Sequence, residues 1–139
     1  MDFTWNDQLT PAQTEVLVGW YQQEWWSGGR QPKDVQRMLT HSKVVALAGP
    51  DGQLAAFSRV VSDFTYKALI LDVIVAPSLR GQGLGRRMMG EILERLKEVA
   101  HLELYCAGGM VPFYQSFGFE VLAQSEALFF MRKVQKALK

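Results

Sequence analysis

The sequence is poor in cysteine and has no long apolar run. Cys106 is the single cysteine among 139 residues, so no disulfide can form within the chain, which fits a reducing compartment. The first ten residues, MDFTWNDQLT, include acidic residues and lack the apolar core of a signal peptide. The longest apolar stretch, residues 68–77, is short and contains Asp72, so it cannot span a bilayer. We therefore expect a soluble cytoplasmic protein that makes no membrane contact.

An excess of charge of either sign is also missing. The chain carries 15 Lys and Arg against 14 Asp and Glu, a net charge of +1. This balance argues against a nucleic-acid partner, because such binding depends on neutralising many phosphates. No group of His, Cys, Asp and Glu has metal-ligand spacing, so no metal is expected. Without a linker or repeat, the chain is predicted to form a single domain over residues 1–139.

The apolar pattern predicts an alternation of strands and helices. Thr10 followed by Pro11 is typical of a helix start, and Gly-Pro-Asp-Gly at 49–52 predicts a hairpin. The run at 68–77 is apolar on both faces, as in a central strand covered by helices. We expect an α/β fold with a central mixed, mostly antiparallel sheet of six to seven strands and helices on both faces. The expected strands lie within 2–9, 43–63 (two), 68–77, 101–107, 119–124 and 127–134, and the expected helices lie over 11–26, 33–42, from Leu84 onward, and over 111–118.

Three glycines at every second position separate the central strand from the following helix. Gly81, Gly83 and Gly85 stand among Arg80, Arg86 and Arg87. Glycine permits a positive φ and a close approach to the main chain, and a helix N-terminus attracts anions. The loop is therefore predicted to hold a pyrophosphate. A Walker A loop is excluded because no Lys-Ser/Thr follows, and the dinucleotide fingerprint is excluded because Met88 replaces its third glycine.

The stretch from Val75 to Arg86 reads V-x-P-x-x-R-G-x-G-x-G-R, and residues 111–119 read VPFYQSFGF. In their strand–loop–helix context, these motifs resemble the acetyl-CoA loop and the C-terminal motif of the GCN5-related N-acetyltransferase (GNAT) superfamily. The run from Phe64 to Gly85 is most similar to cyanobacterial and plastid members and to small arylalkylamine- or protein-acetylating members. The resemblance covers roughly residues 43–134 and implies acetyl transfer from acetyl-CoA, the co-substrate, to a primary amine in a ternary complex.

The resemblance also implies roles for particular residues. The strand backbone would align with the pantetheine arm, and one of its N–H groups would polarise the thioester carbonyl. Tyr114 matches the tyrosine that protonates the departing CoA thiolate in many members. The implied cofactor-binding residues are Val73, Ile74, Val75, Arg80, Gly81, Gln82, Gly83, Leu84, Gly85 and Arg86.

A base for the incoming amine is harder to assign. Asp72 is the first candidate, because a carboxylate in an apolar strand needs a partner or a function. The alternative for Asp72 is a buried group bonded to neighbouring backbone. Glu103 is a weaker candidate, and a water relay is a third possibility. Cys106 is predicted to be a small core residue, because His101 lies on the opposite face of its strand and forms no activated pair with it.

Several aromatic residues fall where GNAT folds shape the acceptor pocket. Trp20 and Trp25 are predicted to lie in the core, on the same helix face as Val16, whereas Trp26, Phe64 and Tyr66 are the pocket candidates. The acceptor stays open among an arylalkylamine, a polyamine, an antibiotic, a protein N-terminus and a lysine. A longer acyl donor and a CoA-binding module without turnover are the alternatives to acetyl transfer. The last strands, which include the apolar ALFFM, are expected to offer a sheet edge that allows a homodimer.

Overall fold

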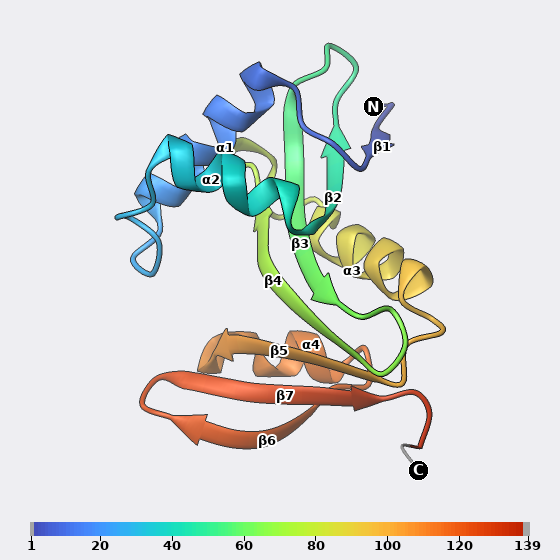
Figure 1. Cartoon of the computed structure of the whole chain (residues 1–139). Helices are drawn as coiled ribbons and strands as arrows, with labels where there is room; N and C mark the ends of the chain where they lie inside the picture. The colour runs from blue at the N-terminus through green and yellow to red at the C-terminus, as the bar shows by residue number, and fades with distance from the viewer. Residues whose placement is uncertain (1, 138–139) are drawn as a thin grey trace.

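The computed structural model describes residues 2–137, which form one seven-stranded sheet with helices on both faces (Figure 1). The strands lie in the order β1-β2-β3-β4-β5-β7-β6. The order of elements along the chain is the predicted one. The elements are β1 (Thr4–Asn6), α1 (Pro11–Gln23), α2 (Pro32–Thr40), β2 (Lys43–Ala48), β3 (Leu54–Ser62), β4 (Lys67–Val75), α3 (Leu84–Arg95), β5 (His101–Ala107), α4 (Val111–Gln115), β6 (Glu120–Ser125) and β7 (Leu128–Val134).

The two faces of the sheet carry separate apolar cores. On one face, α1 and α2 cover β2–β4 through a cluster that includes Leu17, Tyr21 and Phe57. On the other face, α3 and α4 pack on a larger cluster that includes Met88, Ile92 and residues of β5. Alternate residues of a regular strand point to opposite faces, so Ile70 and Ile74, four residues apart, would share a face. They lie in different cores because the extra residue of a bulge between them shifts the alternation.

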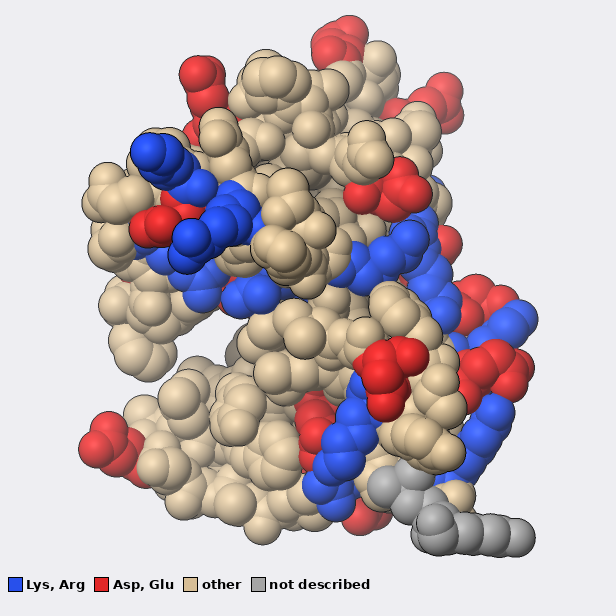
Figure 2. Space-filling view, in the orientation of Figure 1, with Lys and Arg blue, Asp and Glu red and all other residues tan. Residues whose placement is uncertain are grey.

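The sheet divides where its single parallel pair of strands ends. Residues 67–70 of β4 pair with residues 101–104 of β5, and within the described residues this ladder extends no further. Beyond it, β5 continues along β7, while β4 continues along β3 (Figure 1). Figure 2 shows the surface hollowed between these two halves, with Lys and Arg side chains gathered along its upper edge.

A bulge in β4 accompanies this divergence. Phe57 pairs with Ile74 and Arg59 pairs with Leu71, so two residues of β4 stand opposite one residue of β3. Asp72, inside the bulge, adopts φ = 56°, a conformation that non-glycine residues rarely adopt. A bulge bends its strand and interrupts regular pairing, which turns the end of β4 away from β5.

The helical N-terminal region differs from the sequence-based expectation in one respect. Thr10 caps α1 as expected, accepting a hydrogen bond from the Gln13 amide at 3.1 Å, but α1 ends at Gln23 and does not continue to residue 26. Trp20 is buried, as predicted. Trp25 is 75% exposed and Val16 is 43% exposed, so their predicted core positions are wrong. The reason is that α1 ends with an extended residue, which turns Trp25 off the helical face.

The last strand is also placed differently. β7 lies between β5 and β6, so β6 forms the sheet edge. The apolar ALFFM segment (127–131) is therefore not an edge available to a second copy. A returning hairpin explains this order, because β7 runs back between β5 and β6 and pairs with both.

Candidate active site

The glycine loop between β4 and α3 has the backbone conformation that its composition predicts. Gly81 and Gly83 have φ values of 80° and 83°, which residues other than glycine rarely adopt. Gly83 caps the 12-residue helix α3. Its first-turn amides lack partners within the helix and carry the positive end of its dipole. A Cβ placed on Gly81 or Gly83 would meet no atom within 4 Å, so the backbone there is open to a ligand.

The three arginines of the loop do not act together. Arg80 remains beside the loop, where its Nε donates to the Val75 carbonyl oxygen at 3.3 Å. The Arg86 guanidinium lies 4.9 Å from the centre of the Phe117 ring and donates to Ser116 Oγ. Arg87 instead packs against β1, with Cζ 5.5 Å from the Phe3 ring centre.

The end of β4 presents backbone toward the hollow. Val73, Ile74 and Val75 have β3 on one side and lack β5 pairing on the other, within residues 2–137. The bulge is held by Ser58, which is fully buried and whose Oγ donates to the Leu71 carbonyl oxygen at 2.9 Å. Unpaired strand backbone is a template for an extended ligand. A single 3-10 turn, Pro77–Leu79, joins this edge to the glycine loop.

Tyr114 lies in α4 next to Phe113, whose ring approaches Gly85 of the loop. It is 7% exposed and packs edge-on against Phe113, at 5.0 Å between ring centres. Burial raises the pKa of Tyr114 to about 12, so the phenol stays protonated at neutral pH. No group among residues 2–137 hydrogen-bonds to its hydroxyl. Cys106 is buried in the core as predicted, and burial raises the pKa of its thiol.

Asp72 is the centre of a buried polar cluster. Its Oδ2 accepts from Tyr21 Oη at 2.8 Å, Arg30 Nη1 at 2.8 Å and Arg59 Nε at 2.7 Å. Only 5% of its side chain is exposed. Burial by itself would raise the pKa of Asp72, but the hydrogen bonds and charges of the two arginines outweigh burial and lower it. A carboxylate held in this way is a weak proton acceptor. This argues against Asp72 as the base, which stays a prediction.

The lowered pKa of Asp72 predicts a loss of stability in acid. Because the folded carboxyl binds a proton less readily than the unfolded one, its contribution is present above the ordinary Asp pKa of about 4 and is lost as pH falls below that value. Asp72→Asn should lower the free energy of unfolding by about 3 kcal/mol at pH 7. The difference from wild type should shrink below about pH 4. Urea unfolding at several pH values measures it, and a difference independent of pH would contradict the assignment.

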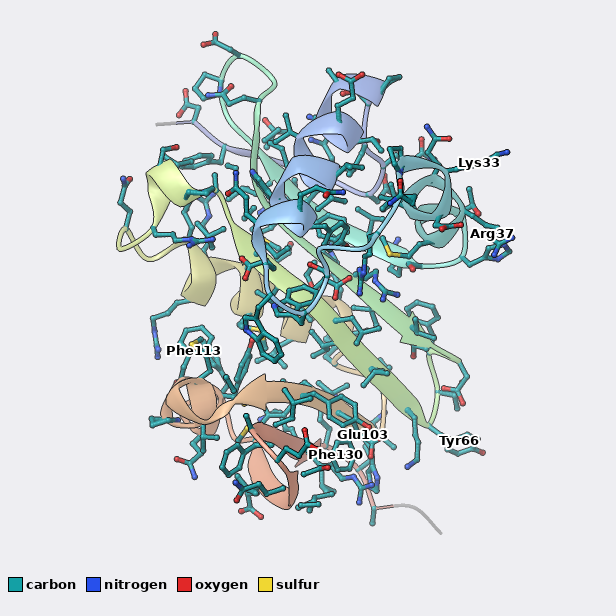
Figure 3. The ribbon with its side chains drawn as sticks, turned by 90° about the vertical axis from the view of Figure 1, so that its left-hand side faces the viewer. Lys33, Arg37, Tyr66, Glu103, Phe113 and Phe130 are labelled. Carbon is teal, nitrogen blue, oxygen red and sulfur yellow. The ribbon has the colours of Figure 1, made fainter. Side chains whose placement is uncertain are left out.

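The remaining predicted site residues lie in two separate parts of the structure. Trp26 lies beside the Asp72 cluster, 6.1 Å from the Tyr21 ring. Phe64 and Tyr66 lie in the β3–β4 turn, at the closed end of the β4–β5 pair, away from the glycine loop. In Figure 3, Tyr66 and Phe113 lie on opposite sides of the view. Phe64 instead lines a separate cavity of about 460 Å³ against α3. The pocket prediction for Phe64 and Tyr66 therefore disagrees with the structure, because the hairpin turns at the other end of the strand.

We call the space between the diverging ends of β4 and β5 the wedge; its closed end is the paired segment of residues 67–70 and 101–104. Glu103 lies at this closed end, where it forms ion pairs. Arg132 Nε donates to it at 2.9 Å, and Lys67 Nζ lies 3.6 Å away. Beside it, Tyr105 and Phe130 stack at 5.0 Å on the half of the sheet that α1 and α2 leave uncovered, where Figure 3 shows Phe130 and Glu103 together. The sequence analysis missed this aromatic pair, although alternation along the strand at 101–107 places Tyr105 on the outer face.

The sequence analysis also missed the three partners of Asp72. An isolated acid in an apolar strand indicates that a partner exists. Tyr21, Arg30 and Arg59 come from three different elements, so no local pattern identifies them. Among residues 2–137, no group of three or more His, Cys, Asp or Glu is placed to hold a metal ion. Within the same range, every helix is too short or too polar to cross a membrane.

Comparison with known proteins connects this geometry to a family. The acetyltransferase (GNAT) family pattern matches residues 8–119. Serotonin N-acetyltransferase 2, chloroplastic, from Oryza sativa subsp. japonica is 38% identical over 96 residues, which make up 65% of this chain and 48% of that protein. The chain spans about half the length of the curated relatives it matches.

Solved structures show the same fold. An aminoglycoside 6′-N-acetyltransferase complexed with coenzyme A superposes with a TM-score of 0.80 at 14% identity, covering 100% of this chain and 99% of that chain. The PaiA N-acetyltransferase from Thermoplasma acidophilum, in complex with coenzyme A, gives a TM-score of 0.72 at 15% identity, with coverage of 96% and 99%. At these identities the likeness concerns the fold alone.

Proposed function

Since this chain belongs to the acetyltransferase (GNAT) family, we propose that it transfers the acetyl group of acetyl-CoA to a primary amine by direct attack in a ternary complex. The observation that carries the proposal is the open edge of β4, which is joined by one 3-10 turn (Pro77–Leu79) to the glycine loop at the N-terminus of α3. An extended pantetheine arm and its pyrophosphate require this combination of free strand backbone and helix amides.

The cofactor-binding residues act through their backbone in this proposal. The edge formed by Val73, Ile74 and Val75 pairs with the pantetheine arm, and one of its amides polarises the thioester carbonyl. Amides of the loop bind the pyrophosphate, where the positive φ of Gly81 and Gly83 leaves space for it. Arg80 and Arg86 add positive charge at the rim. The loop residues in this set are Arg80, Gly81, Gln82, Gly83, Leu84, Gly85 and Arg86.

Tyr114 is the proposed proton donor. The neutral amine nitrogen forms a bond with the acetyl carbon, the carbon–sulfur bond breaks, and the sulfur takes the Tyr114 proton. The nitrogen then releases its surplus proton to water, and Tyr114 regains a proton from water. The raised pKa of about 12 keeps this proton available at neutral pH. The amine must lose a proton first, which costs about 4.6 kcal/mol at pH 7 for a lysine-like group. Since Asp72 is a weak acceptor, a water relay is the favoured route for that proton.

The acceptor is proposed to be an arylalkylamine or a protein amine. Trp26 lies beside Tyr21 and Arg30, and the stacked Tyr105 and Phe130 lie on the β5–β7 half of the sheet. Aromatic walls favour an acceptor with an apolar body. The name of the rice relative, a serotonin N-acetyltransferase, supports the same class. The cationic upper edge in Figure 2 argues against polyamines and other highly cationic acceptors.

A thermal-shift titration tests the cofactor. We expect acetyl-CoA and CoA to stabilise the protein, whereas NAD and ATP do not. At 100 times its Kd a ligand adds about 2.7 kcal/mol, which raises Tm by several degrees in a domain of this size. If neither CoA species stabilises the protein, the proposal is wrong.

Turnover is the second part of this test. Thiol release should be measured with 2-phenylethylamine and with a peptide that has a free N-terminus. Binding of CoA without release of thiol in either reaction would favour the CoA-binding module. Faster release from butyryl-CoA than from acetyl-CoA would favour a longer acyl donor.

A further inference from the structure

The loop between α1 and α2, residues 24–31, forms one wall of the wedge and is attached to the sheet by one strong contact. Arg30, near its end, donates to Asp72 Oδ2 in the β4 bulge at 2.8 Å. At its start, Glu24 forms a longer and more exposed ion pair with Arg80, at 3.5 Å, and other contacts of the loop are local, such as Ser27 Oγ donating to the Tyr21 carbonyl oxygen at 2.9 Å. The position of this wall relative to β4 therefore depends on the Arg30–Asp72 pair.

Arg30 also orders the aromatic residues of the wall. Its Cζ lies 4.4 Å from the centre of the Tyr21 ring and 5.4 Å from the centre of the Trp26 ring. The Tyr21 hydroxyl donates to the same Asp72 oxygen at 2.8 Å. A guanidinium placed over aromatic rings is favourable, more so where water is excluded. Asp72 Oδ2 thus holds both Arg30 and Tyr21, and Trp26 packs beside Tyr21.

Asp72 is placed to hold neighbouring side chains in position, and not to accept a proton. All three of its donors converge on Oδ2, and two of them are guanidinium groups. A carboxylate that neutralises two buried cations would leave an unpaired charge if it took up a proton, which is costly. Its own backbone, at φ = 56°, is part of the bulge that turns β4 away from β5.

We propose that Asp72 is a positioning residue that holds residues 24–31 against the β4 bulge through Arg30 and Tyr21, and so places Trp26 as the wall of the acceptor site. This inference rests on the proposed acetyl transfer. It assigns the pair Arg30–Asp72 to acceptor binding, whereas acetyl-CoA binds to the glycine loop and the edge of β4. Loss of the pair should therefore affect one substrate and spare the other.

Steady-state kinetics with acetyl-CoA and 2-phenylethylamine separate the two roles. Arg30→Met keeps the length of the side chain and leaves Arg59 on Asp72, so it is expected to fold. We expect Arg30→Met and Asp72→Asn each to raise the acceptor KM by at least about 10-fold, with kcat within about threefold of wild type and the KM for acetyl-CoA unchanged. Arg30→Lys should recover part of the loss, and the double variant should be little worse than either single variant.

A matched control is Glu98→Gln, which removes one carboxylate charge from an exposed ion pair with Lys136 (2.8 Å) outside the wedge. It should behave as wild type. A loss of kcat of about 100-fold in Asp72→Asn, together with loss of the acidic limb of the pH profile and an unchanged acceptor KM, would overturn the proposal and make Asp72 the base. An acceptor KM for Arg30→Met equal to that of Glu98→Gln would also overturn the proposal.

Limited proteolysis tests the same contact without turnover. Chymotrypsin cleaves after aromatic residues, and Trp25 and Trp26 both lie in the loop. We expect cleavage there at least about 10-fold faster in Arg30→Met than in wild type or Glu98→Gln, because local opening controls cleavage. Unchanged cleavage overturns the positioning role even if acetyl transfer is established. Faster cleavage supports it even if CoA fails to bind, so the two proposals fail separately.

Discussion

Gly85→Glu is expected to weaken CoA binding by at least about 100-fold while leaving the fold intact. Gly85 lies in the first turn of α3, and a Cβ there would meet the nearest atom, Phe113 Cζ, at an ordinary 3.7 Å. Replacing a helical glycine gains up to about 1 kcal/mol, and an acidic side chain in the first turn is favourable for the helix dipole. The same charge would lie beside the proposed pyrophosphate. Two like charges 4 Å apart repel by about 4 kcal/mol near a protein surface, more than the roughly 2.8 kcal/mol of a 100-fold loss.

Gly90→Glu provides the matched control. Gly90 is exposed in the same helix, and nothing lies within 4 Å of a Cβ placed there. The control has the same change of charge and of helix propensity, so it should bind CoA like wild type. Isothermal titration calorimetry with CoA measures both variants, and urea unfolding measures their stability. Equal affinity of the two variants would place the pyrophosphate elsewhere.

Tyr114→Phe is expected to lower kcat by at least about 100-fold, the usual size of a contribution from a positioned acid. Affinity for CoA should not change, because the proposed cofactor contacts come from β4 and the glycine loop. The free energy of unfolding should change by less than about 1 kcal/mol, since the hydroxyl has no partner among residues 2–137 and its removal leaves no group unsatisfied. Thiol release at saturating substrates measures the loss.

The dependence of kcat on pH gives a second test of Tyr114. A donor with a pKa of about 12 keeps its proton throughout the ordinary assay range, so kcat should not fall between pH 8 and 10.5 as a result of its titration. Tyr66→Phe, at an exposed tyrosine at the closed end of the wedge, is the control and should retain full activity. A Tyr114→Phe enzyme within threefold of wild type would leave the departing thiolate to solvent and remove Tyr114 from the mechanism.

The order of helices and strands was predictable because it depends on short-range patterns. Apolar periodicity identified α3, and the Gly-Pro-Asp-Gly run identified the β2–β3 hairpin. The glycine loop was also predictable, since a positive φ at Gly81 and Gly83 is a property of neighbouring residues. The end of α1 was not, because the extended turn at Glu24 is supported by contacts to the body of the protein.

Local chemistry in the chain was therefore enough to locate the proposed pyrophosphate loop and to single out Asp72, whereas Tyr114 was assigned through the resemblance of residues 111–119 to the GNAT C-terminal motif. Tertiary contacts set everything that requires two distant segments. They decide that β4 and β5 part after Ile70 and that Arg30 and Arg59 meet at Asp72. They also place Trp26 beside Tyr21 and Arg30, and Phe64 in a cavity against α3. The physical reason is that a side chain's type and its neighbours govern its conformation and its chemistry, whereas its partners depend on sheet order and on where each turn reverses the chain. For Asp72, the sequence alone led to the prediction of a base, whereas the tertiary contacts support the proposal of a positioning residue.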